Sequence, residues 1–140
     1  MKILIIDGQG GGVGKNIIEQ LLKRQGNIEL VAVGTNSIAS SAMLKAGATA
    51  VATGENPVIY NCKDADFIVG PIGIISANSM YGEISPNMAL AVSQSKAKKV
   101  LIPISKSNIF VVSSLDKPMQ TYIDDAVSYI FDIISHNSEN

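Results

Sequence analysis

The chain opens with the stretch ILIIDGQGGGVGK, which occupies residues 3–15. Its apolar residues 3–6 predict a buried strand that ends at Asp7. Five glycines follow within positions 8–14, the glycine loop, and the apolar spacing beyond it predicts a helix. Glycines let a backbone come close to a ligand, and free N–H groups at a helix start favour an anion. The stretch therefore predicts a phosphate-binding loop between a strand and a helix.

The spacing of these glycines distinguishes between known phosphate loops. The Walker pattern would need glycine at Gln9 and a hydroxyl at Asn16, so it fails at both positions. The G-x-G-x-x-G pattern fails because it would need glycine at Val13. The pattern G-x-x-x-G-x-G fits, at Gly8, Gly12 and Gly14. This spacing resembles the cofactor loop of short-chain dehydrogenases, whose fold is doubly wound.

The sequence departs from those dehydrogenases in two ways. Their Tyr-x-x-x-Lys pair is missing, because Tyr60 lies three residues before Lys63 and the other tyrosines have no lysine four residues on. The acid that often follows the second strand is also missing, and Thr35, Asn36 and Ser37 stand in its place. Because this cluster is neutral, it would tolerate a ribose phosphate. If a dinucleotide binds, the sequence slightly favours its phosphorylated form.

The rest of the chain alternates short apolar runs with helical patterns. Strands are expected at residues 3–6, 30–33, 48–52, 67–70, 100–102 and 109–112. Helices are expected at residues 13–24, 37–46, 57–62, 86–98 and 122–134. This alternation predicts an α/β fold, a doubly wound Rossmann-like three-layer sandwich with a mostly parallel sheet of about six strands. We expect one domain over residues 1–140, with strand order 3-2-1-4-5-6 or the flavodoxin-like order.

Ligands of such folds bind beyond the carboxyl ends of the strands. The expected phosphate contacts are Gly8, Gly10, Gly11, Gly12, Val13, Gly14 and Lys15. The expected ribose contacts are Thr35, Asn36 and Ser37, and the far side is expected from Gly70, Pro71, Ile72, Gly73 and Lys106. Glu83 is the best general-base candidate in the long connection 71–86, which is otherwise a polar surface loop. No catalytic residue is assigned.

Composition limits the function classes. Hydrophobic residues make up 46% and charged residues 16% of the chain, which is typical of a folded globular protein. The net charge is -1, and the cluster Lys96, Lys98 and Lys99 is too small for a nucleic-acid footprint. Cys62 is the only cysteine and His136 the only histidine, so neither a disulfide within the chain nor a Cys/His metal site is expected. With no membrane segment expected, the sequence predicts a soluble cytoplasmic protein.

Together with the glycine loop, several stretches resemble a small bacterial family of unknown function. These stretches lie at residues 33–37, 43–47, 52–56, 69–73 and 98–103. The resemblance covers most of the chain, implies a stand-alone bacterial protein, and supplies no activity. The residues favour a domain that binds or senses a nucleotide or dinucleotide, NAD(P) among them. Two alternatives stay open: a small NAD(P)-dependent enzyme with its pocket at a homodimer interface, and an interaction module that keeps the loop for shape.

Overall fold

The computed structural model describes residues 1–24, 26–104, 108–112 and 116–138. Five parallel strands form one sheet in the order β3-β2-β1-β4-β5. In chain order the strands are β1 (Lys2–Asp7), β2 (Glu29–Gly34), β3 (Ala50–Thr53), β4 (Phe67–Pro71) and β5 (Lys98–Ile102). This confirms the α/β Rossmann-like fold, and the order of these strands is the Rossmann order rather than the flavodoxin-like one.

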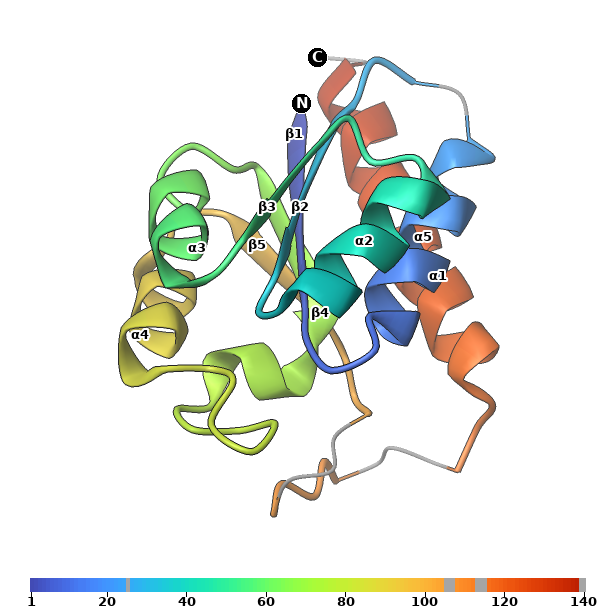
Figure 1. Ribbon diagram of the computed structural model, residues 1–140. Coiled ribbons are helices and arrows are strands. Elements are labelled where there is room, and N and C mark those ends of the chain that lie inside the picture. The colour runs from blue at the N-terminus through green and yellow to red at the C-terminus, as the bar shows by residue number, and fades with distance from the viewer. Residues whose placement is uncertain (25, 105–107, 113–115, 139–140) are drawn as a thin grey trace.

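Helices cover both faces of the sheet (Figure 1). On one face lie α1 (Gly12–Leu22), α2 (Ser37–Ala46) and α5 (Met119–Ser138). On the other lie α3 (Glu55–Asn61) and α4 (Pro86–Gln94), and a short 3-10 helix, η1 (Ile72–Ile75), follows β4. Alternate residues of β1 enter the two cores, Ile3 and Ile5 on the first face and Leu4 and Ile6 on the second. This explains why the sequence of β1 is apolar without interruption.

The expected sixth strand at residues 109–112 does not form. Residues 108–112 have no strand structure, and the side chains of Phe110 and Val112 are exposed. A short apolar run is compatible with a strand but does not require one, because pairing needs a neighbouring strand edge at the right place. No described helix is long and apolar enough to cross a membrane.

Candidate functional site

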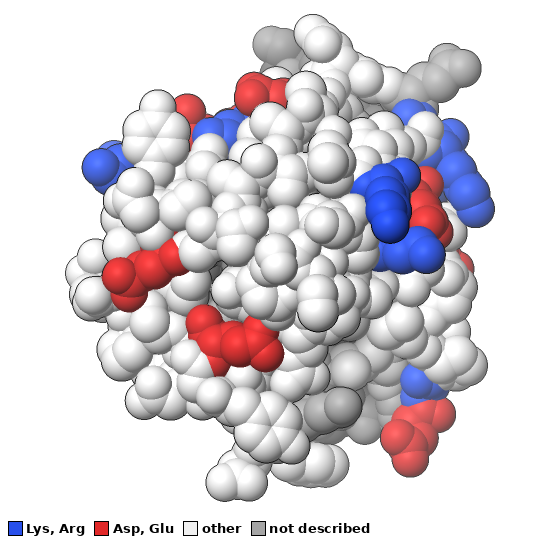
Figure 2. Space-filling model, in the orientation of Figure 1, with Lys and Arg blue, Asp and Glu red and all other residues white. Residues whose placement is uncertain are grey.

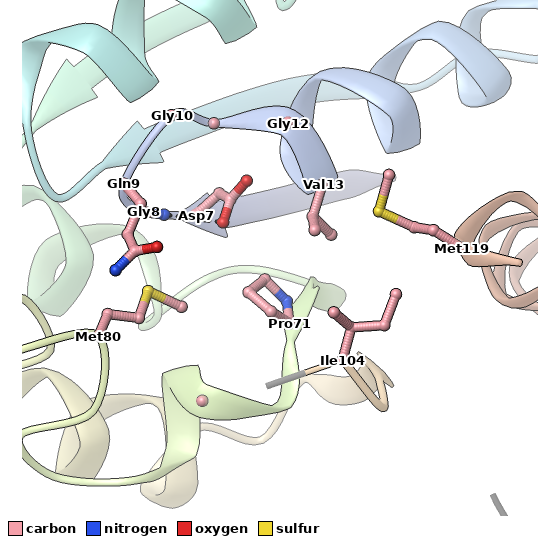
Figure 3. A pocket seen from close by; sticks show the side chains of 12 residues that line it. Asp7, Gly8, Gln9, Gly10, Gly12, Val13, Pro71, Met80, Ile104 and Met119 are labelled. Atoms are coloured by element: carbon pink, nitrogen blue, oxygen red, sulfur yellow. Dashed lines mark hydrogen bonds between the residues drawn. The ribbon is translucent and has the colours of Figure 1, made fainter. Parts of the chain in front are cut away.

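A pocket of about 240 Å³ lies between the glycine loop and the carboxyl ends of β4 and β5. One wall is the backbone of residues 7–13. In Figure 3 the apolar side chains of the opposite wall face the space beside this loop, together with Val13 of the loop itself. That opposite wall consists of Pro71, Gly73, Met80, Ile104 and Met119. The pocket is therefore mostly apolar, with backbone N–H groups and Asp7 as its polar groups.

Two kinds of glycine occupy the loop. Gly11 is needed by the fold, because its φ is 75° and a Cβ there would lie 2.8 Å from Cα of Ala39 in α2. Gly10 and Gly12 have no positive φ, and a Cβ on either would meet no atom within 4 Å. Neither packing nor backbone conformation explains glycine at these two positions. Their N–H groups form no hydrogen bond within the described part of the chain.

A buried carboxylate organises the start of α1 from below. Asp7 is 4% exposed. Its Oδ1 accepts a hydrogen bond from the N–H of Gly8 at 2.8 Å, and its Oδ2 accepts one from Gly14 at 2.7 Å. Burial raises the pKa of Asp7, these hydrogen bonds oppose the rise, and the nearby charge of Glu83 adds to it. Asp7 thus takes the N–H groups of Gly8 and Gly14, and the N–H of Val13 also lowers its pKa. The N–H of Gln9 donates to Glu83 and that of Gly11 to the carbonyl of Gly8, which leaves Gly10 and Gly12 for a ligand anion.

The residues expected at the ribose hold a carboxylate of the protein itself. Oε1 of Glu83 accepts hydrogen bonds from Oγ1 of Thr35 at 2.6 Å, Nδ2 of Asn36 at 2.7 Å and the N–H of Gln9 at 2.9 Å. Thr35 and Asn36 are themselves neutral, but they hold the negative charge of Glu83 at this position. The sequence could not indicate this, because Glu83 lies 48 residues from Thr35 along the chain.

The same contacts determine the charge of Glu83. Burial alone would raise its pKa, but the hydrogen bonds from Thr35, Gln9 and Asn36 outweigh burial and lower the pKa. Glu83 is therefore ionised at neutral pH. A carboxylate with a lowered pKa is a weak general base. The contacts of Glu83 therefore suit a structural role better than proton transfer: they join the glycine loop to the loop after β2.

Glu83→Gln is expected to reduce the loss of stability in acid. Because its pKa is lowered by folding, ionised Glu83 stabilises the fold above the ordinary glutamate pKa, and this contribution is lost as pH falls through the lowered pKa. The difference in unfolding free energy between the wild type and this variant should therefore shrink from about pH 7 to about pH 3, measured by urea unfolding. Glu29→Gln, at an exposed position at the start of β2, is the control. An equal difference at both pH values would contradict the role given to these hydrogen bonds.

The other expected site residues are only partly brought together. Pro71 and Gly73 line the pocket beside the glycine loop. Gly70 is buried beneath it, and Ile72 does not line it. Lys106 lies outside the described residues.

Lys15 and Ser37 are not brought to this pocket. They line a separate groove between α1 and α2, together with Lys45 and Glu19. Figure 2 shows basic groups on the right with acidic groups among them, and separate charged groups elsewhere on this side of the molecule. Lys15 lies on the side of α1 that faces α2. The packing of these two helices therefore places it in the groove and away from the pocket.

Outside the stretch of residues 3–15, three pocket residues were not anticipated: Met80, Ile104 and Met119. Ile104 lies two residues beyond the end of β5, so the rule that ligands lie at the carboxyl ends of strands could have found it. No pattern in the sequence indicates that Met80 and Met119 would lie at the pocket. Cys62 is buried, which raises the pKa of its thiol to about 11, so it packs as a small apolar side chain. No described group of three His, Cys, Asp or Glu side chains could hold a metal.

A parallel sheet in this order, with a glycine loop from its first strand to its first helix, defines a Rossmann-like α/β protein. The chain belongs to the family described as Domain of unknown function (DUF3842), which matches residues 2–135. This confirms the resemblance found in the sequence. No curated protein matches the chain. Among solved structures, a dodecameric FMN-dependent Ubix-like decarboxylase from Escherichia coli O157:H7 is similar, with 14% identity and a TM-score of 0.46 over 96% of this chain and 95% of that chain.

Proposed function

We propose that the protein binds a nucleotide, with a phosphate on the backbone N–H groups of Gly10 and Gly12. The observation that carries this proposal is the open space at these two glycines, where neither a positive φ nor a close neighbour requires glycine. Glycine at the first position of α1 lowers helix stability relative to alanine. Close approach of a ligand to the backbone is a reason to keep it, and the start of a helix attracts anions.

The rest of the pocket suits the apolar part of such a ligand. Pro71, Ile104 and Met119 offer apolar surface opposite the loop, and Val13 adds apolar surface from the loop itself (Figure 3). Ligand pockets commonly combine such walls with a few directed polar groups. No lysine or arginine is among the described lining residues, so backbone N–H groups and the dipole of α1 would hold the phosphate.

Binding or sensing is favoured over catalysis by the state of the two acids beside the pocket. Asp7 accepts hydrogen bonds from the loop backbone, and Oε1 of Glu83 accepts three from the loops at the ends of β1 and β2. Both carboxylates therefore contribute to the structure of the loops. A small-molecule sensor needs this kind of preformed site and no proton-transfer group.

Thermal unfolding of the purified protein with AMP, ADP, ATP, FMN, coenzyme A, NAD(H) and NADP(H) tests the proposal. A ligand at 100 times its Kd contributes roughly 2.7 kcal/mol, which raises the midpoint by several degrees. We expect a rise with at least one nucleotide. Gly12→Asp is expected to abolish it, because the new carboxylate would occupy the loop and repel a phosphate.

Asn87→Asp is the matched control for this experiment. It adds the same charge at an exposed position in the first turn of α4, on the opposite face of the sheet. This variant should keep the full rise in midpoint. Ligand-free protein that responds to none of these nucleotides would overturn the proposal.

A further inference from the structure

The crevice above the sheet is open on one side of β1 and filled on the other. The pocket lies on the β4 side, where its walls come from β4, the segment after β5, and α5. The β2 side is crossed by the connection of residues 72–85, which follows β4 and returns to the loop after β2. A dinucleotide in a doubly wound fold spans both sides of this crevice.

Three kinds of contact fill the β2 side. Oε1 of Glu83 accepts its three hydrogen bonds from residues of both loops. Nδ2 of Asn36 also donates to the carbonyl of Gln9 at 3.0 Å, which joins the loops directly. A Cβ on Gly8 would lie 2.8 Å from Sδ of Met80, so this side chain is packed against the glycine loop. Figure 3 places Gln9 and Met80 at one end of the pocket, away from Met119.

The connection of residues 72–85, which carries Met80 and Glu83, has an unusual backbone conformation. Asn78, Met80 and Tyr81 have positive φ values of 65°, 56° and 57°, although none of them is glycine. Such residues cost free energy and persist where the surrounding structure holds them. Here the connection is held by the bonds of Glu83 to Gln9, Thr35 and Asn36.

We propose that Glu83, with Met80, makes this site specific for mononucleotides over dinucleotides. The inference rests on the proposed nucleotide function and narrows it. A second nucleoside would need the space that Met80 fills and the donors that Oε1 of Glu83 already uses. A ribose phosphate would in addition meet the negative charge of Glu83, which reverses the slight preference for a phosphorylated dinucleotide inferred from the sequence.

Calorimetric titration of the full chain with AMP, FMN, NAD⁺ and NADP⁺ tests this inference. The wild type should bind AMP or FMN at least about tenfold more tightly than either dinucleotide. In Glu83→Ala the ratio of mononucleotide to dinucleotide affinity should fall by about tenfold or more. Met80→Ala should shift the ratio in the same direction while leaving the hydrogen bonds of Glu83 in place, so the test does not depend on one variant folding.

Glu29→Ala is the control, because it removes the same charge at the opposite end of β2. It should keep the wild-type ratio. Wild-type protein that binds NAD⁺ or NADP⁺ as tightly as AMP and FMN would overturn the specificity of Glu83 and leave the nucleotide function standing. Absence of binding to all four probes in the wild type and both variants would overturn the inference, and the proposed function would fall with it only if ADP, ATP and coenzyme A also failed to bind.

Discussion

Gly70→Ala is expected to lower the free energy of unfolding by about 3 kcal/mol. Gly70 lies in β4 beside the central strand β1, and a Cβ there would lie 2.2 Å from the carbonyl oxygen of Ile6. Since that neighbour is backbone inside a parallel sheet, it cannot turn aside as a flexible side chain would. The strands must separate locally, with loss of ladder geometry. Urea unfolding would show this as a lower midpoint with an unchanged slope.

Gly10→Ala is the control for this variant. A Cβ on Gly10 would have no atom within 4 Å, so its effect should stay within about 0.5 kcal/mol. If Gly70→Ala proved as stable as Gly10→Ala, the close approach of β4 to Ile6 would be contradicted.

Gly11→Ala should lower the free energy of unfolding by a similar amount, about 3 kcal/mol. Two causes act together here. The left-handed φ of 75° is unfavourable for alanine, and the added Cβ would lie 2.8 Å from Cα and 3.0 Å from the carbonyl oxygen of Ala39. Because both atoms belong to the backbone of α2, relief requires the glycine loop and α2 to move apart. Urea unfolding measures the loss.

The adjacent Gly12→Ala gives the sharpest comparison. Gly12 is the first residue of α1, and a Cβ on it would meet nothing within 4 Å. Alanine favours a helix over glycine, so this variant should match or exceed wild-type stability, by up to about 1 kcal/mol. Equal losses at the two neighbouring positions would show that the loop does not pack on α2 as described.

The architecture around β1 follows from local patterns of the chain. An apolar run, five glycines and an amphipathic helix in residues 3–22 predict strand, loop and helix, and the structure has all three in these places. Alternation of such segments predicts a parallel sheet covered on both faces, which is also observed. These features were predictable because apolar periodicity and the backbone freedom of glycine are local properties of the chain. For the same reason the sequence pointed to the glycine loop, whose residues line the pocket.

Tertiary structure alone decided which side chains meet at the site. The bonds of Glu83 to Thr35 and Asn36 join residues 48 and 47 positions apart, through a connection that has no apolar period to follow. The packing of α1 and α2 placed Lys15 in a groove between those helices, and residues 109–112 form no strand although their sequence is apolar. Local patterns select a strand, a helix or a turn. Which half of the crevice is filled depends on contacts between distant segments, and these form only when the whole chain is folded.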